Sequence, residues 1–237
     1  MLSVSVVLAV IAVAAVLSGL ALDRRPRPQA VASNASLLVL TWGPSLCKVE
    51  PSNSGCRSGH VGRMGRSFVL HGLWPQPSTE QYCDVPKRTA DRARKPVSLP
   101  DDVKTSLQEM MSDSSVMTTH EWYAHGTCSG VTPPEYFGIA TALAAQAGEV
   151  LDPLFAGAEG RPMSSRAVRS AFDTRFGRGT GNRVGLNCRD SGGSDGIVYE
   201  VRLSLPPVAA IGDTPSLASA LAAGPAVGPG CGQGGVP

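Results

Sequence analysis

The chain has 237 residues, enough for one domain with a sizeable core, and only 17% of them are charged. Residues 1–32 contain three arginines and one aspartate, so the rest of the chain carries 18 basic and 18 acidic side chains. Proteins that bind long nucleic acids by counterion release usually carry an excess of basic residues. The equal numbers of basic and acidic side chains after residue 32 show no such excess. Any polyanionic ligand would therefore be held locally, over a few of its units.

An almost wholly apolar run, residues 2–22, comes first and is followed by a basic cluster within residues 23–27. This pattern favours a secretory signal peptide, followed by a linker up to residue 32. An uncleaved membrane anchor is the alternative, because about twenty apolar residues can just span a bilayer. The missing basic residue before the run, and the basic cluster after it, weaken the signal-peptide interpretation. We expect a secreted or extracytoplasmic protein with a folded domain over residues 33–237. It would be anchored to a membrane only if residues 2–22 are not cleaved.

The cysteines form an even set of six, without a CxxC pair or a Cys/His spacing typical of zinc sites. Behind an export segment, this set favours disulfides over free core thiols. The spacing alone does not choose among the possible pairings. The six are Cys47, Cys56, Cys83, Cys128, Cys188 and Cys231.

Two short strands are expected in the first third of the chain. Residues 37–42 form an apolar run before Gly43-Pro44, and residues 67–71 form a second one. Because residues 72–75 should break the second strand, His71 is expected at a strand end, where its side chain can enter a cleft. The segments expected to be loops are 57–66 and 76–100. Residues 101–112 have the apolar spacing of a helix.

The run HEWYAHGTC, residues 120–128, predicts a helix with a chemically active face. A helix advances about 100° per residue, so His120, Glu121 and His125 lie on one arc, together with Ala124. Trp122 then points toward whatever the helix packs against. We expect Thr118 or Thr119 to cap this helix, Gly126 to end it in a left-handed turn, and Cys128 to tether its end.

The second half of the chain mixes helices and strands without regular alternation, which indicates an α+β fold. Residues 133–147 predict a helix with a Thr-Pro-Pro-Glu start and Gly148 at its end. A further helix should run from residue 164 or 165 to 176, followed by a hairpin of strands at 184–188 and 197–205. The core is expected over residues 37–205. Residues 206–237 are rich in Pro, Ala and Gly and are expected to be loop or disorder, with Cys231 holding the tail to the core.

An imidazole has a pKa near neutrality, so of two imidazoles one can accept a proton from a substrate while the other donates a proton to it. Phosphoester transfer to a neighbouring hydroxyl needs this pair of roles. In RNA the 2′-hydroxyl is the nucleophile, so the first step requires neither a metal nor an activated water. Single-stranded RNA also favours aromatic stacking, and Trp74 and Tyr82 lie close to His71 in the sequence.

Three segments resemble the ribonuclease T2 family of secreted acid endoribonucleases. FVLHGLWPQ at 68–76 and HEWYAHGTC at 120–128 are similar to its two active-site segments, and LTWGPSLC at 40–47 is similar to its first strand and cysteine. The resemblance implies a central antiparallel sheet flanked by helices. It also implies an endoribonuclease that cleaves single-stranded RNA but not DNA, through a 2′,3′-cyclic phosphate, without metal or cofactor. We expect the protein to be a monomer.

The resemblance assigns catalytic roles to four residues. It implies that His71 protonates the leaving 5′-oxygen and that His125 takes the proton of the 2′-hydroxyl. His120 matches the phosphate-binding histidine, and Glu121 matches the carboxylate that stabilises or orients the transition state.

The resemblance also assigns substrate-binding and structural residues. Trp74 and Tyr82 match aromatic positions of the primary base pocket, and Gln76 occupies a position that tunes base choice in some members. The implied disulfides are Cys83–Cys128, which would hold the two active-site segments in register, Cys47–Cys56 and Cys188–Cys231.

The chain departs from the family pattern at Ala124, where members usually carry a lysine. Loss of a cation beside the phosphorane should raise the barrier by a few kcal/mol, on the order of one oxyanion-hole donor, unless another group such as Arg66 or Lys87 replaces it. Thr118 and Thr119 replace a bulky aromatic stretch, which leaves the second base site open.

Two other functions remain as alternatives. A member that has lost activity could serve as an RNA-binding or interaction module. A zinc hydrolase is disfavoured because its motif needs two histidines four residues apart, and His120 and His125 are five apart.

Overall fold

The computed structural model describes residues 33–86, 94–190 and 196–237. The predictions for residues 1–32, including the signal peptide or anchor, lie outside these residues, and so does Lys87. Within the described ranges, no helix combines the length and apolar character needed to cross a membrane.

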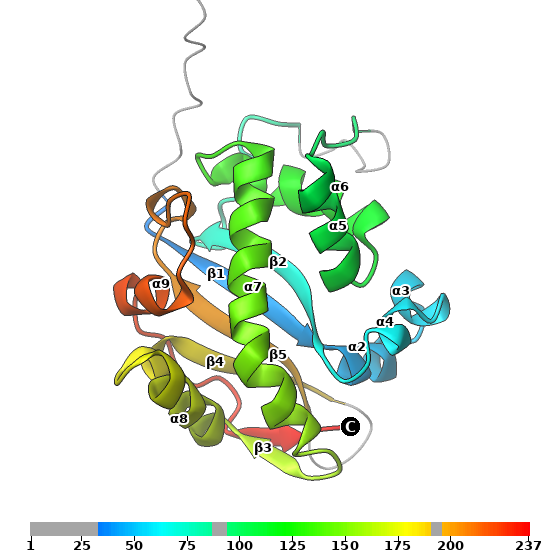
Figure 1. The fold of residues 1–237 in the computed structure, drawn as a ribbon, viewed down its shortest axis with the longest axis vertical. Helices are drawn as coiled ribbons and strands as arrows, with labels where there is room; N and C mark the ends of the chain where they lie inside the picture. The colour runs from blue at the N-terminus through cyan, green and yellow to red at the C-terminus, as the bar shows by residue number, and fades with distance from the viewer. Residues whose placement is uncertain (1–32, 87–93, 191–195) are drawn as a thin grey trace, which may run out of the picture. The chain divides into compact units, whose positions relative to one another are not determined.

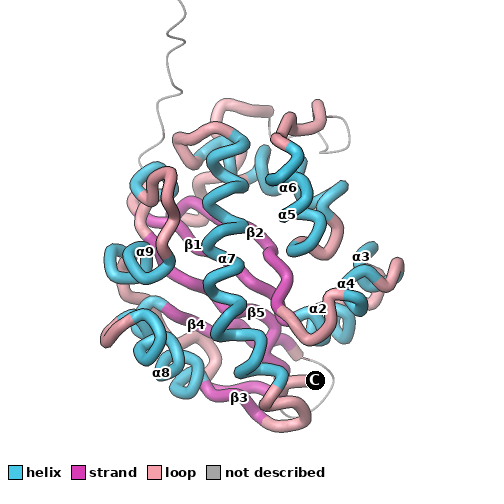
Figure 2. Tube along the Cα trace, in the orientation of Figure 1, coloured by secondary structure: helices cyan, strands magenta, loops and turns pink. Residues whose placement is uncertain are grey.

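A six-stranded sheet forms the centre of the described domain (Figures 1 and 2). The strand order is β2-β1-β5-β6-β3, and β4 pairs with β5 off this path. The strand pairs are antiparallel except β5 with β6, which is parallel. The strands are β1 (Ala35–Trp42), β2 (Phe68–Gln76), β3 (Pro162–Ser164), β4 (Val184–Arg189), β5 (Ile197–Leu205) and β6 (Gln233–Gly235). The predicted α+β class with a mainly antiparallel sheet is confirmed.

Helices flank this sheet, and α7 crosses one of its faces (Figure 1). The helices are α2 (Gly43–Val49), α3 (Ser54–Arg57), α4 (His60–Arg63), α5 (Asp101–Met110), α6 (Ser114–Ala124), α7 (Pro133–Ala156), α8 (Ser165–Phe176) and α9 (Leu217–Ala223). Short 3-10 turns lie at Gly126–Cys128, Thr180–Arg183 and Val208–Ala210. The helices expected near residues 101–112 and from residue 164 or 165 to 176 are therefore present, and Ser164 caps α8.

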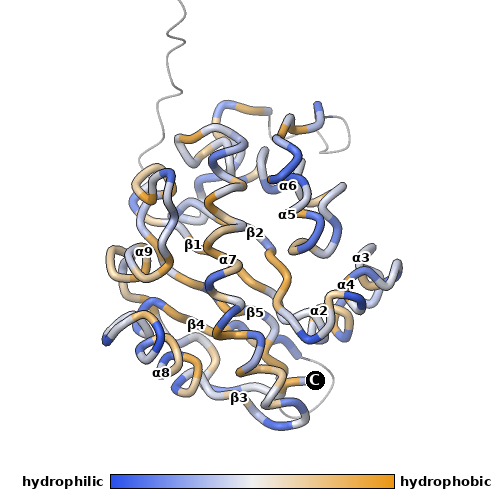
Figure 3. Tube along the Cα trace, in the orientation of Figure 1, coloured by the Kyte–Doolittle hydropathy of each residue, from blue (hydrophilic) through white to orange (hydrophobic). Residues whose placement is uncertain are grey.

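The core lies between α7 and the sheet. Leu38 and Leu40 of β1 alternate toward it, as do Leu203 and Leu205 of β5, and all four are buried. Figure 3 shows the hydrophobic stretches of these strands beneath α7. Burial of these side chains is the main stabilising contribution, because apolar surface removed from water contributes about 25 cal/mol per Å².

Helix α7 is longer than its sequence predicts. It begins as expected, with a capping box between Thr132 and Glu135. It does not end at Gly148 but continues to Ala156, because Leu151 and Phe155 are buried in the core on its next turns. Tertiary packing here outweighs the low helix propensity of glycine.

Two segments expected to be irregular are ordered. Residues 57–66 include α4, whose Val61 packs in a small cluster with Leu46, Val69 and Tyr199. Residues 206–237 contain α9 and β6, with Leu217, Leu221 and Val236 buried. The expectation of loop or disorder in the tail is wrong because these few apolar residues lie against the core, which their spacing in the sequence does not reveal.

Three disulfides close the domain: Cys47–Cys56, Cys83–Cys128 and Cys188–Cys231. These are the pairs that the resemblance implied. Cys188–Cys231 joins β4 to the tail, and Cys83–Cys128 joins the segment after β2 to the turn that follows α6. The second of these bonds therefore connects the two segments that carry the candidate catalytic residues.

Candidate active site

His71 lies in the interior of β2, at an irregularity of the sheet. Val39 of β1 pairs with Gly72 and Leu40 pairs with Leu70, so His71 is the extra residue of a β-bulge. The expectation that residues 72–75 end the strand is wrong, because pairing with β1 continues to Gln76. A bulge turns one side chain out of the regular alternation, and here it presents His71 to the functional site.

The His71 ring is held from the sheet side. Its Nδ1 lies 3.0 Å from Oε1 of Glu200 in β5. The His71 side chain is 31% exposed, whereas the Glu200 side chain is only 2% exposed. One ring nitrogen is therefore anchored on a buried carboxylate, and the ring keeps an open edge.

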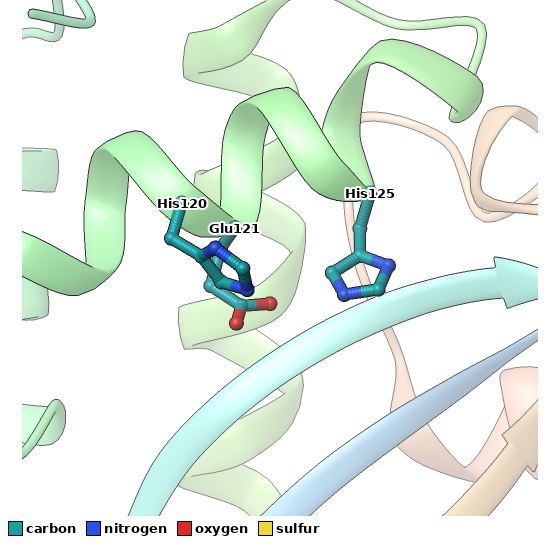
Figure 4. Close-up of side chains that lie close together, drawn as sticks. All are labelled: His120, Glu121 and His125. Carbon is teal, nitrogen blue, oxygen red and sulfur yellow. The ribbon is translucent and has the colours of Figure 1, made fainter. Parts of the chain in front are cut away.

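Helix α6 supplies His120 and Glu121, and its C-cap residue, His125, is the third of the other candidate groups. The helix starts at Ser114 and its cap is Asp113, so the expectation that Thr118 or Thr119 caps it is wrong. Each of the three side chains offers one polar atom, and these atoms lie within 4.8 Å of one another. Figure 4 shows the three side chains projecting from α6 and the adjoining turn toward β2. The arc predicted from helical spacing therefore brings them together.

Trp74 joins the strand residue to the helix residues. Its ring centroid lies 5.0 Å from that of His71 and 5.2 Å from that of His125, on which it stacks. Its Nε1–H donates a 2.9 Å hydrogen bond to Oε2 of Glu121. The two imidazoles thus pack against one indole.

Two glycines allow these close approaches. A Cβ on Gly72 would lie 1.9 Å from Oε2 of Glu121, so only glycine lets that carboxylate reach the strand. Gly126 does not adopt the left-handed conformation expected for it; a Cβ there would lie 2.2 Å from the Trp122 ring. Trp122 packs on Tyr136 of α7, as predicted for the side of α6 that faces the core.

The two candidate acid–base histidines have opposite electrostatic surroundings. Burial alone would lower the pKa of His71, but its hydrogen bond to Glu200 and the negative charges of Glu121, Glu200 and Glu50 raise that pKa above 6.5. Burial, together with the positive charges of His120 and His71, lowers the pKa of His125 to about 3. At mildly acidic pH, His71 is therefore protonated and His125 is neutral.

Comparison with known proteins assigns the chain to a family. Residues 34–214 match the model of the ribonuclease T2 family. The chain belongs to the ribonuclease T2 family. Ribonuclease MC of Momordica charantia is 30% identical over 156 residues, which cover 64% of this chain and 77% of that protein. A ribonuclease of Aeromonas hydrophila is 30% identical over 108 residues, covering 45% of this chain and 42% of that protein.

Solved structures support the fold assignment. A variant of the T2-type RNase MC1 in complex with 5′-UMP superposes with a TM-score of 0.55 at 25% identity, covering 75% of this chain and 90% of that one. Trichomaglin, described as an S-like ribonuclease, superposes with a TM-score of 0.55 at 16% identity, covering 86% and 97% of the two chains. Trichomaglin, at this identity, supports the fold alone.

The candidate base-pocket residues lie beside this T2-family site. Tyr82 donates its backbone N–H to the carbonyl oxygen of Ala124 at 2.9 Å. The Arg94 guanidinium lies 5.2 Å from the centre of the Tyr82 ring and 4.8 Å from that of Tyr123, close enough for cation–π attraction. Gln76 donates to the carbonyl oxygens of Trp74 and Pro75.

Ala124, at the position where the resemblance implies a lysine, is buried. Of the two cations considered as replacements, Arg66 forms an ion pair with Glu159 after the end of α7. Lys87 lies outside the described residues. Arg66 is therefore committed to another part of the fold.

A cavity of about 100 Å³ adjoins His71 on the side of α2 and α6. Its polar lining includes Glu50, Asn53 and Ser112, and its apolar lining includes Met117. The cavity therefore adjoins the candidate site through His71.

The sequence interpretation missed Glu200, although a signal was present. The inward alternation of Val201, Leu203 and Leu205 places Glu200 on the opposite face of β5, in the middle of an apolar strand. An acidic residue in such a position normally has a buried partner. The sequence did not indicate that this partner is His71.

Proposed function

We propose that this protein cleaves single-stranded RNA by metal-independent acid–base catalysis with His71 and His125. Family membership supports the ribonuclease activity itself. The mechanism depends on one observation: two imidazoles pack on the same indole, one with a raised pKa and the other with a lowered pKa. A general acid must be protonated and a general base must be neutral at the same pH, and this pair meets both requirements.

In the first step, neutral His125 takes the proton of the 2′-hydroxyl, and the 2′-oxygen attacks the neighbouring phosphorus. The bond from phosphorus to the 5′-oxygen breaks, and Nε2 of protonated His71 gives its proton to the leaving oxygen. The products are a 2′,3′-cyclic phosphate and a free 5′-hydroxyl. In the second step, His71 takes a proton from water, water opens the ring, and His125 returns its proton to the 2′-oxygen, leaving a 3′-phosphate.

His120 and Glu121 would act on the phosphorane rather than on the transferred protons. Their polar atoms lie in the same group as that of His125, so a phosphate bound there would contact all three residues. A ring N–H of His120 would donate to a phosphoryl oxygen, and Glu121, held by Trp74, would orient the neighbouring groups.

Substrate binding would use the aromatic and polar groups around this centre. Trp74 and Tyr82 supply the aromatic surfaces on which an unpaired base can stack, and Gln76 supplies an amide near them. The RNase MC1 variant binds 5′-UMP, which is consistent with a mononucleotide-sized site in the family. The cavity beside His71 would receive the nucleoside on the leaving side of the scissile phosphate.

We further propose that the protein works as a monomer outside the cytoplasm, without metal or cofactor. Three disulfides suit an oxidising compartment. DNA would not be a substrate, because it lacks the 2′-hydroxyl that serves as the nucleophile.

The test is cleavage of a single-stranded RNA by the purified protein in EDTA, with the DNA of the same sequence alongside. We expect 2′,3′-cyclic and then 3′-phosphate ends from RNA, and intact DNA. Ala124→Lys should increase kcat, since a cation near the phosphorane stabilises its charge. RNA that is retained but not cut by either form would instead support the alternative of an impaired, RNA-binding member. Loss of cleavage in EDTA would contradict the metal-independent mechanism.

A further inference from the structure

Glu200 is a buried carboxylate at the centre of a polar network, and the cleavage steps proposed above give it no role. Its Oε1 contacts Nδ1 of His71 at 3.0 Å. Its Oε2 accepts hydrogen bonds from Nδ2 of Asn187 at 3.0 Å and from Nη2 and Nε of Arg202 at 2.8 and 3.1 Å. Both carboxylate oxygens are therefore occupied, by groups from β2, β4 and β5.

The sheet geometry imposes this arrangement. Glu200 pairs with Asn187 on one side and with Thr41 on the other, so their side chains share one face of the sheet. The bulge in β2 turns His71 toward that face. A second irregularity, between Asn187 and Cys188, places Tyr199 as the extra residue of β5 directly before Glu200. Backbone irregularities thus flank the His71–Glu200 contact in two strands.

We propose that Glu200 is the positioning residue of His71, with Arg202 and Asn187 holding its carboxylate in place. This inference rests on the proposed function of His71 as general acid. A carboxylate on Nδ1 fixes the tautomer and the orientation of the ring, so that Nε2 carries the proton toward the leaving oxygen. Glu200 acts only through His71 and does not contact the substrate.

Charge balance explains why the network includes Arg202. Hydrogen bonds from His71 and Arg202 overcome the effect of burial and lower the pKa of Glu200 to about 2, so Glu200 stays ionised at every working pH. Arg202, whose side chain is 40% exposed, neutralises that charge. Protonated His71 then leaves the trio with one net positive charge beside the phosphate site.

Other charged groups also face His71, and they set the size of the expected effect. Glu121 approaches from α6 and Glu50 from the segment after α2, and both raise the pKa of His71. His125 faces it from the end of α6 and acts in the opposite direction when protonated. Removing the charge of Glu200 should therefore lower the His71 pKa without abolishing the influence of the remaining carboxylates.

The experiment measures the His71 pKa by NMR titration of the imidazole in the wild-type protein and in two variants. Glu200→Gln keeps the side-chain volume and removes the charge, and we expect it to lower the His71 pKa by about one unit, a tenfold change in the protonation equilibrium. Arg202→Gln removes a neighbouring positive charge and should raise the same pKa. A purely structural role would not produce shifts of opposite sign.

Activity provides the second measurement. In Glu200→Gln, the alkaline limb of kcat/KM should move to lower pH with the His71 pKa, and kcat should fall more than KM changes. The loss should be about 10–100-fold, below the full contribution of a general acid. In Glu200→Asp the His71 pKa should be lowered less than in Glu200→Gln, because aspartate keeps the negative charge.

Asp152→Asn is the matched control. The half-buried Asp152 carboxylate accepts the Phe68 N–H at the start of β2, and its loss should leave the His71 pKa unchanged.

The outcomes separate this inference from the proposed function. An active enzyme whose His71 pKa is the same in Glu200→Gln and wild type would overturn the positioning role and leave the cleavage mechanism intact. The expected pKa shifts in a protein that does not cut RNA would support the pairing and refute the cleavage. If Glu200→Gln does not fold, Arg202→Gln decides, since a lowered or unchanged His71 pKa there contradicts the proposal.

Discussion

The sheet and the helix each hold a histidine of the site, and their surroundings shift the pKa values of the two imidazoles in opposite directions. His71, on β2, has a buried carboxylate on Nδ1 and further carboxylates nearby, so its pKa lies above the ordinary 6.5. His125, at the end of α6, is buried beside two other histidines, and its pKa falls to about 3. The ring centroids of His71 and His125 lie 5.0 and 5.2 Å from that of the Trp74 indole.

This difference shows how two identical residues acquire different chemistry. An imidazole is stabilised in its charged form by acceptors on its ring nitrogens and by nearby negative charge, and in its neutral form by burial and nearby positive charge. The sheet supplies the first environment through Glu200. The helix end supplies the second, because its neighbours are His120 and the stacked Trp74 ring.

The largest expected effect comes from deleting either ring. His71→Ala and His125→Ala should each lower kcat by about 10²–10⁴-fold, the usual contribution of a general acid or base. The measurement is RNA cleavage in EDTA. His60→Ala is the matched control, since His60 lies on α4 beside a separate polar cavity. A loss of similar size in the control would contradict the assignment.

The bond between the two sides should matter next. Cys83–Cys128 closes a sequence separation of 45 residues and Cys47–Cys56 one of 9. Replacing the first pair by serine should therefore lower the free energy of unfolding by about 4 kcal/mol, and replacing the second by about 2.5 kcal/mol. Urea denaturation measures both. Equal losses would argue that loop entropy does not determine the contribution of the bond between β2 and α6.

A single methyl group tests how closely the two sides approach. Gly72→Ala would place a Cβ against Oε2 of Glu121 and should displace that carboxylate from Trp74. We expect kcat to fall about 10–100-fold, since about 1 Å of misplacement can cost that much. Gly62→Ala serves as control, because a Cβ at Gly62 meets no atom within 4 Å. Unchanged activity in Gly72→Ala would remove Glu121 from the mechanism.

The smallest expected effect is the pH dependence within the mildly acidic range. The rate should rise with pH through the His125 pKa of about 3, because the base must be neutral. It should fall again through the His71 pKa, above 6.5, because the acid must be protonated. A profile of kcat/KM against pH should therefore be broad, with its maximum on the acid side of neutrality. A rate that keeps rising into the alkaline range would contradict these roles.

Much of the site was predictable from local sequence. Helical spacing placed His120 and Glu121 on one face of α6, with His125 directly after its end, and the start of α7 follows from its capping residues. These features depend on residues within a few positions of one another. Local backbone geometry and capping hydrogen bonds determine them, and both can be read from the sequence.

Other features depended on contacts between distant segments. The extension of α7 beyond Gly148 and the order of residues 206–237 came from packing against the core, which local propensity does not report. The bulge at His71 came from its pairing with β1. None of these leaves a periodic pattern in its own segment.

The sequence by itself determined which side chains are available for catalysis and which of them share a helix face. The tertiary structure decided which histidine holds a proton, because Glu200 lies 129 positions from His71 in the chain and meets it only through the sheet. Proton affinity depends on the charges and burial around a ring, and those are properties of the folded neighbourhood rather than of the residue.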